Sequence, residues 1–343
     1  MSLPPASSPI SDSAARIFEL VTSSWVSTAV SAAAELGVAD VMSETPMPVG
    51  EIAERVGTDA DALYRLLRAC AELEIVEESP GRAFSLTGDG LALREDAPDS
   101  MRGYARWLGG PDEGSTMVAL ADAVRTGEPV WEAVHGAPVW QYMSENPRSE
   151  WIFDRGMDDL SAQLTRTMVQ DYDFGDCGLV VDVGGGRGVL LALVLATHPH
   201  LEGVLFERPE VVARSDSVLD RPGIAERCRI EAGDFFESVP AGGDTYLLAQ
   251  VIHNWGDEDA VRILANCRRA MRPDGRVLLA EMVVYEGVER SHTAKFMDLS
   301  MLAHCGGKQR TPTQFAELFE ASGLRLNRVV SGVGVGVVEG VLA

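Results

Sequence analysis

The hydrophobic pattern divides the chain near residue 175. Before this point, apolar residues recur at helical spacing. The helices expected in the first part of the chain cover residues 17–36, 49–56 and 59–73. Two short apolar segments follow at residues 75–77 and 83–86, with a turn at Pro80-Gly81 between them. Helices followed by such a hairpin predict a mostly helical, winged-helix unit.

After residue 178, short continuous apolar runs alternate with helical stretches. Such runs indicate strands buried on both faces, as in a parallel sheet covered by helices. The expected strands cover residues 179–183, 203–206, 229–231, 245–251, 276–281, 324–330 and 333–342. Only a short turn at Ser331-Gly332 separates the last two, so we expect an antiparallel hairpin at one edge. The predicted fold class is α/β, with a mostly parallel, doubly wound sheet.

The same pattern gives four segments. Residues 1–13, rich in Ser and Pro, are expected to be a disordered lead-in, and residues 14–110 to be the winged-helix unit. Residues 111–174 form a helical, aromatic-rich connector, and residues 175–343 form the sheet domain. No apolar run approaches the ~18 residues of a membrane span, and the N-terminus lacks the features of a signal peptide. Five widely spaced cysteines indicate neither a disulfide framework nor a zinc site, so we expect a cytoplasmic protein without a metal.

A winged helix usually suggests DNA binding, and the negative charge of this segment argues against that function. The net charge is −23. Residues 1–110 hold 8 Arg, no Lys and 17 acidic residues, a net charge of −9. Nucleic acid and anionic membranes bind concentrated positive charge, so neither is an expected partner. The unit is interpreted as a dimerisation scaffold, and a ligand-sensing regulator stays open as an alternative.

The clearest chemical motif is a glycine-rich turn after the first expected strand of the sheet. Asp182 begins the pattern Asp-x-Gly-x-Gly-x-Gly, which includes Gly184 and Gly186. Glycines let a ligand approach the backbone, whose N–H groups bind its polar atoms. The dinucleotide pattern Gly-x-Gly-x-x-Gly fails, because its third glycine would fall on Val189.

Two acids extend the motif. Glu207 ends the next strand, where a carboxylate can accept both hydroxyls of a ribose, and Asp234 follows the third. In open α/β sheets, ligands bind outside the carboxyl ends of the strands. The three acids therefore predict a site for an adenosine-containing ligand.

With these residues in place, nearly the whole chain resembles the plant-type small-molecule O-methyltransferases and their bacterial relatives in aromatic polyketide and antibiotic pathways. The turn at residues 182–188 is similar to that of class I methyltransferases. The most specific segments are residues 251–258, 273–275, 279–281, 297–301 and 306–311. The resemblance implies a Rossmann-like catalytic domain, homodimerisation through the winged helix, S-adenosyl-L-methionine as cofactor, S-adenosyl-L-homocysteine as product and a small aromatic acceptor.

The resemblance also implies residue roles. The general base would be His253, oriented and supported electrostatically by Glu281. The cofactor would contact Asp182, Gly184, Gly186, Glu207, Asp234, Phe235, Trp255 and Ser161, with Trp255 on the adenine. The acceptor would meet Phe153, Met157, Met301, Asn254, Cys305 and Gln309.

Three positions depart from the family pattern. Ala249 stands where a lysine often contacts the cofactor, and Asn254 stands where an aspartate commonly follows the base. Gln309 replaces the second acid beside the base in the plant enzymes. Because Gln309 holds no negative charge, only Glu281 is expected to orient His253. These changes keep open a C- or N-methyltransferase, or a cofactor-retaining enzyme with other chemistry.

Overall fold

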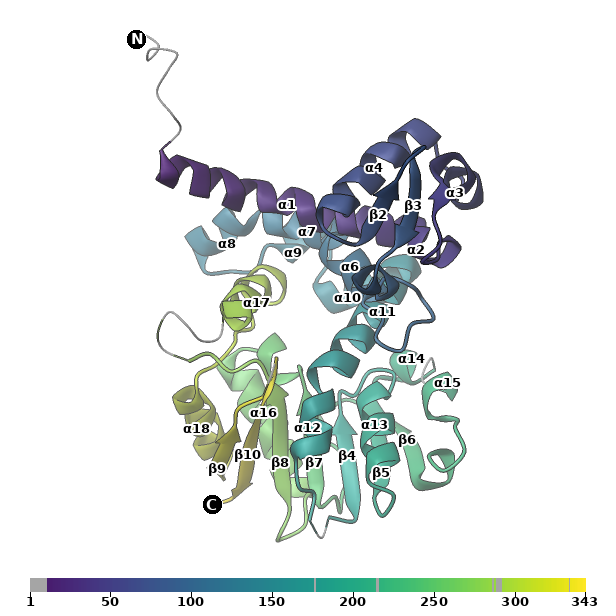
Figure 1. Cartoon of the computed structure of the whole chain (residues 1–343). Helices are drawn as coiled ribbons and strands as arrows, with labels where there is room; N and C mark the ends of the chain where they lie inside the picture. Colours follow the sequence, from purple (N-terminus) through teal and green to yellow (C-terminus); the bar gives the residue numbers. More distant parts are fainter. Residues whose placement is uncertain (1–10, 176, 214–215, 286, 288–291, 333) are drawn as a thin grey trace, which may run out of the picture. The chain divides into compact units, whose positions relative to one another are not determined.

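The computed structural model describes residues 11–175, 177–213, 216–285, 287, 292–332 and 334–343 (Figure 1). These fall into two compact units, residues 1–114 and 115–343. Residues 1–10 of the expected lead-in lie outside the described residues. Asp12 and Ser13, which were expected to belong to that lead-in, already form the start of helix α1 (Asp12–Leu36).

The N-terminal unit consists of helices around a small antiparallel sheet. Its elements are α1, α2 (Val38–Val41), β1 (Met47–Pro48), α3 (Val49–Val56), α4 (Ala60–Glu72), β2 (Val76–Ser79), β3 (Ala83–Leu86), α5 (Gly88–Leu91), α6 (Arg102–Leu108) and the start of α7 (Pro111–Val118). The strand order is β1-β3-β2. The side chain of Asp59 accepts a hydrogen bond from the Ala62 N–H at 2.8 Å, so Asp59 is the N-cap of α4. The predicted winged-helix elements are all present.

Helix α1 exposes large apolar side chains. Phe18, Val21 and Trp25 are 66%, 69% and 70% exposed, whereas the buried positions Ala33 and Ala34 lie near its C-terminus. The N-terminal turns extend away from α3, α4 and the hairpin of the same unit (Figure 1). By length and mean hydropathy alone, α1 could cross a membrane, although no such segment was expected from the sequence. Exposed large apolar side chains gathered on one helix mark an interaction surface.

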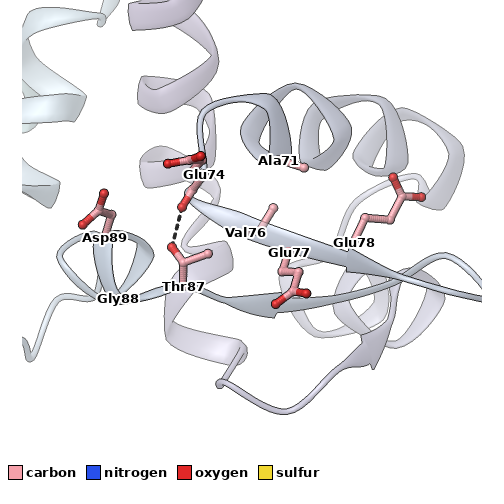
Figure 2. A pocket seen from close by; sticks show the side chains of 8 residues that line it. All are labelled: Ala71, Glu74, Val76, Glu77, Glu78, Thr87, Gly88 and Asp89. Atoms are coloured by element: carbon pink, nitrogen blue, oxygen red, sulfur yellow. Dashed lines mark hydrogen bonds between the residues drawn. The ribbon is translucent and has the colours of Figure 1, made fainter.

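The face of the hairpin is acidic. Figure 2 shows a shallow hollow in which Glu74, Glu77, Glu78 and Asp89 lie around Val76 and Thr87. Glu78 accepts a hydrogen bond from the Tyr64 hydroxyl at 2.8 Å, and the Thr87 hydroxyl donates to the Glu74 carbonyl at 2.5 Å. This charge is opposite to the one that attracts a phosphate backbone.

The C-terminal unit is built on a seven-stranded sheet. Its strands are β4 (Leu179–Val183), β5 (Glu202–Glu207), β6 (Cys228–Ala232), β7 (Thr245–Ala249), β8 (Arg276–Glu281), β9 (Leu324–Val330) and β10 (Gly336–Leu342). The order is β6-β5-β4-β7-β8-β10-β9. Strands β4 to β8 pair in parallel, and β10 runs antiparallel to both neighbours. This confirms the mostly parallel sheet and its edge hairpin.

Side-chain alternation along the strands builds two cores, one on each face of the sheet. Val181 and Val183 pack with α16 (Asp257–Ala270) and α18 (Pro312–Ala321). Val180 packs on the other face with α13 (Val189–Thr197) and α12 (Arg166–Asp171). Burial on both faces explains why the strands are continuous apolar runs.

The remaining helices of this unit include the expected connector. They are α8 (Leu120–Thr126), α9 (Trp131–His135), α10 (Val139–Glu145), α11 (Pro147–Leu164), α14 (Pro209–Val212), α15 (Asp216–Leu219) and α17 (His292–His304), with 3-10 turns η1 (Ala225–Arg227) and η2 (Ile252–Asn254). Among the connector aromatics, Trp131 is fully buried against His135, Tyr142 and His304.

The site follows from the sheet topology. Strand β4 pairs with β5 on one side and with β7 on the other, so the chain reverses its direction across the sheet at β4. Such a switch point leaves a crevice at the carboxyl ends of the strands. The strand expected at residues 245–251 ends earlier, at Ala249, because Gln250 has a φ of 54° and η2 follows.

Candidate active site

The turn after β4 has a conformation that requires glycine. Gly184, Gly186 and Gly188 have φ values of 69°, 57° and 85°, a region that L side chains rarely adopt. A Cβ on Gly185 would lie 2.5 Å from the carboxyl group of Asp182. The turn therefore presents bare backbone directly above a carboxylate.

Glu207 and Asp234 lie at the ends of the two neighbouring strands, as predicted. The Glu207 carboxylate accepts hydrogen bonds from the Gly186 N–H at 3.3 Å and the Arg208 N–H at 2.7 Å. Burial raises the pKa of Glu207. Asp234 is exposed and accepts a hydrogen bond from the Phe236 N–H at 2.8 Å. The glycine turn and Glu207 are thus in direct contact.

Asp182 is the most buried of the three acids, at 1% exposure. Neither carboxylate oxygen has a hydrogen-bond partner among the described residues. Burial, and next the charge of Glu207, raise the pKa of Asp182 to about 7. A buried carboxylate without donors is stabilised by a cation. The residues present therefore fit a ligand that carries positive charge and a ribose.

An aromatic wall borders the same turn. The Trp255 ring meets Phe235 and Phe236 edge to face, at centroid distances of 5.9 and 4.7 Å. A Cβ on Gly184 would lie 3.5 Å from the Phe235 ring. These rings are only partly buried, so part of their apolar surface is accessible to a ligand such as a purine.

Helix α11 joins the glycine turn through an ion pair. The Asp158 carboxylate bonds the Arg187 guanidinium, with both side chains mostly buried. Burial raises the pKa of Asp158 to about 6, and Arg187 acts in the opposite direction. Ser161 lies one turn further along α11 and is half-buried. The pair thus holds the helix that carries Met157 and Ser161 against the predicted cofactor site.

His253 lies in η2, directly after β7. It is buried, and Nδ1 lies 2.6 Å from Nε2 of Gln309. The Glu281 Oε2 atom lies 3.7 Å from the same Nδ1 atom. Burial lowers the pKa of His253 to about 3. The imidazole is therefore neutral, as a general base must be.

Glu281 ends β8 and is fully buried. Its Oε1 accepts hydrogen bonds from the Ile252 N–H at 2.9 Å and the His253 N–H at 3.4 Å, and its Oε2 accepts one from the Gln250 amide at 3.2 Å. Burial raises its pKa to about 8, against the opposing effect of Arg310. The expectation that Glu281 alone orients the imidazole needs correction. Its hydrogen bonds hold the backbone of the turn, and Gln309 makes the short contact with the ring.

Arg310 is a structural residue that sequence reasoning missed. It is 1% exposed and donates hydrogen bonds to the Ile252 carbonyl at 3.1 Å and the Trp255 carbonyl at 2.8 Å. Its guanidinium also pairs with Asp257 at 2.8 Å. Arg310 thus binds backbone carbonyls that lie before and after His253 in the chain. One arginine in a polar segment gives no sign of this burial.

The other predicted acceptor residues lie on α11, η2 and the end of α17. Phe153, Met157, Asn254, Met301 and Cys305 are half-buried. The Asn254 amide donates to the Gln250 carbonyl at 3.2 Å, so this side chain also holds the turn. Cys305 contacts the Met301 carbonyl, with Sγ at 3.6 Å from the oxygen. Of the six residues, Gln309 contacts the imidazole directly.

We expect Arg310→Met to lower the free energy of unfolding by roughly 3 kcal/mol, because it leaves buried carbonyls unsatisfied and removes a buried partner of Asp257. Denaturant unfolding measures the change. The control Arg272→Met removes an exposed guanidinium that pairs with Asp244 at 2.9 Å, and should cost less than about 1 kcal/mol. Equal, small effects of the two changes would contradict the role of Arg310.

Comparisons with known proteins identify the family. The sequence model of the O-methyltransferase domain matches residues 117–325, and that of the O-methyltransferase dimerisation domain matches residues 18–90. The chain is 35% identical to the phenazine O-methyltransferase PhzM of Lysobacter antibioticus over 324 residues, which cover 94% of each protein. The crystal structure of CalO1, a methyltransferase in calicheamicin biosynthesis with S-adenosylhomocysteine bound, superposes with a TM-score of 0.84 at 40% identity. It covers 96% of this chain and 98% of that one.

Among these relatives, a hydroxylase is named for a reaction other than methyl transfer. The aclacinomycin 10-hydroxylase RdmB of Streptomyces purpurascens is 32% identical over 303 residues, which cover 87% of this chain and 81% of that protein. The match to the methyltransferase model nevertheless spans more than half of this chain. The chain belongs to the S-adenosylmethionine-dependent O-methyltransferase family and carries both its dimerisation domain and its methyltransferase domain.

Proposed function

We propose that this enzyme methylates a hydroxyl group of a small aromatic secondary metabolite, with His253 as the general base. The observation that carries the proposal is the buried, neutral imidazole at the carboxyl edge of the sheet, in the turn that follows β7. Nδ1 faces Gln309 and Glu281, so Nε2 is the ring atom available to an acceptor. A base at this place serves a reaction in which a hydroxyl loses its proton.

Residues around the glycine turn would hold the cofactor. Asp182 supplies a carboxylate for positive charge, Glu207 supplies one for ribose hydroxyls, and the wall of Phe235 and Trp255 supplies a surface for adenine. Gly184, Gly186, Asp234 and Ser161 complete the proposed set. S-adenosylmethionine, when bound, supplies a methyl group on a positively charged sulfur.

The protein's own contribution is alignment and proton removal. The residues of the site would orient the acceptor hydroxyl towards the methyl group that the bound cofactor supplies, an effect that is worth up to ~7–11 kcal/mol in favourable cases. His253 would take the hydroxyl proton at Nε2, which frees the acceptor oxygen to receive the methyl group. Half-buried apolar residues, Phe153, Met157 and Met301, favour an aromatic ring as the carrier of the hydroxyl. Relatives named for phenazine and naphthoate acceptors support this class.

A second candidate is an enzyme of this family with altered chemistry. The RdmB relative favours it, as do Asn254 and Gln309, which depart from the acidic pattern at the base. Mass spectrometry of products from a panel of phenolic polyketides, aminocoumarins and catechols separates the candidates. A gain of one methyl group on oxygen supports the proposed function, whereas a methyl group on nitrogen or carbon, or a gain of one oxygen, supports the alternative.

We also propose a cytoplasmic homodimer that binds neither nucleic acid nor membranes. The five cysteines are free, which suits a reducing compartment. The acidic hollow at the hairpin opposes phosphate. The dimerisation model matches residues 18–90, which include most of α1, so a second copy is the proposed cover for its apolar side chains.

His253→Ala should reduce turnover by about 10²-fold or more, because water is then the only acceptor for the hydroxyl proton. Its affinity for S-adenosylhomocysteine should stay nearly unchanged, since the base lies outside the proposed cofactor contacts. Methyl transfer and calorimetry measure the two quantities. The exposed His200, changed to Ala, is the matched control and should keep full turnover. Full turnover in His253→Ala would rule out the general base.

Affinity for S-adenosylmethionine should rise with pH up to about 7. In the free protein the Asp182 pKa is about 7, and a bound cation lowers it, so binding releases a proton below that pH. The expected gain approaches tenfold per pH unit on the acid side. Asp182→Asn should remove most of this dependence of affinity on pH. Glu207→Gln should weaken binding but leave the pH dependence in place. Calorimetry across pH tests both, and a flat wild-type profile would contradict the assignment.

Trp25→Asp should weaken the dimer by about 10²-fold or more, because it places a charge within a buried apolar contact. Light scattering after size exclusion gives the mass of the assembly at several concentrations. Val330 is also exposed and apolar but lies on β9, so Val330→Asp is the control and should stay dimeric. Equal behaviour of the two variants would contradict α1 as the interface.

A further inference from the structure

Gln309 makes the short polar contact with the imidazole of the proposed base. Its side-chain nitrogen lies 2.6 Å from Nδ1 of His253, and the residue is buried at 4% exposure. Its backbone N–H donates to Asp298 Oδ1 at 2.8 Å, which anchors the segment beside α17. An uncharged amide therefore occupies the place next to Nδ1.

The end of the amide that faces Nδ1 decides the tautomer of the ring. An amide nitrogen donates only, so it would leave the ring proton on Nε2, where no further proton can be accepted. An amide oxygen accepts from Nδ1–H and leaves the Nε2 lone pair free. The oxygen and nitrogen ends of the Gln309 amide have nearly the same shape. Rotating the amide by half a turn about its terminal side-chain bond exchanges the two atoms within the same space.

The surroundings favour the second arrangement. The Glu281 Oε2 atom lies 3.7 Å from Nδ1, beyond hydrogen-bond distance, so the Gln309 amide is the group in direct contact with that nitrogen. In the present orientation, Oε1 of Gln309 is buried and has no hydrogen-bond partner among the described residues. Turning Oε1 towards Nδ1–H gives that oxygen a donor.

We propose that Gln309 is a positioning residue that holds His253 as its Nδ1–H tautomer without adding negative charge, and that the site is therefore matched to acceptors whose hydroxyl is already acidic. This inference rests on the proposed hydroxyl methylation. It names the class of acceptor as hydroxyquinones, nitrophenols or similar rings whose oxyanion is delocalised.

The charge argument links the amide to the acceptor. A carboxylate at position 309 would stabilise the imidazolium that forms when His253 takes a proton, and the amide does so far less. Glu281 is the other acid beside the ring, and burial raises its pKa to about 8 while burial lowers that of His253 to about 3. An ordinary phenol, with a pKa near ~10, gives up its proton to such a base only with difficulty. A hydroxyl with a lower pKa transfers its proton to such a weak base more readily.

The tautomer can be measured without an acceptor. Full-length protein labelled with ¹⁵N-histidine gives separate nitrogen signals for the two tautomers, and His253→Asn assigns the resonance. We expect the Nδ1–H form in the wild-type protein, and a mixture of tautomers in Gln309→Met, which keeps the length of the side chain but cannot hydrogen bond. An Nε2–H ring in the wild type, or an unchanged tautomer in Gln309→Met, would overturn the proposal. Circular dichroism and S-adenosylhomocysteine binding verify that the variant is folded.

A second variant tests the charge. Gln309→Glu should keep the Nδ1–H tautomer and raise the pKa of His253 by at least one unit. The exposed Gln170, changed to Glu, makes the same chemical change elsewhere and should leave that pKa where it is. An unchanged His253 pKa in Gln309→Glu would overturn the electrostatic part of the proposal.

Acceptor preference completes the test, with catechol and 4-nitrocatechol as probes and methyl-labelled cofactor. The wild type should prefer 4-nitrocatechol, and Gln309→Glu should reduce that preference by about tenfold. An equal preference in both enzymes would overturn the match to acidic hydroxyls. The absence of methyl transfer to any acceptor would count against the proposed function, and the nitrogen spectra would still decide the tautomer.

Discussion

The chemistry of this protein depends on the removal of ionisable side chains from water at the carboxyl edge of its sheet. Asp182, His253 and Glu281 are all buried, and burial is the largest cause of each pKa shift. It keeps the imidazole neutral and leaves Asp182 suited to a cationic ligand. The properties of the Asp182 region and of the His253 region thus follow from the same physical effect.

Backbone geometry makes this burial possible. The glycine turn leaves room above Asp182 that any side chain would fill, and the positive φ of Gln250 ends β7 so that His253 turns into the site. Glu281 and Arg310 then hold the turn from opposite sides, one accepting its N–H groups and the other donating to its carbonyls. His253 is therefore fixed by groups that contact its backbone, while Gln309 contacts its ring.

Much of this was predictable, for local reasons. Strands buried on both faces must be apolar throughout, so the sheet could be predicted from its runs, and residues 179–183 and 276–281 match their strands residue for residue. The end of β7 was placed two residues late, since the apolar pattern continues through Val251 while the backbone has already turned.

The sequence by itself determined the order of strands and helices, the glycine turn, and the acids that end the first strands of the sheet, because these depend on residues close together in the chain. Only the tertiary structure decided which groups surround His253. Gln309 and Arg310 lie more than fifty positions from His253 in the sequence, and their partners are set by how the segment after α17 packs against η2. Burial, hydrogen-bond partners and hence pKa values arise from such distant contacts, and no local pattern records them.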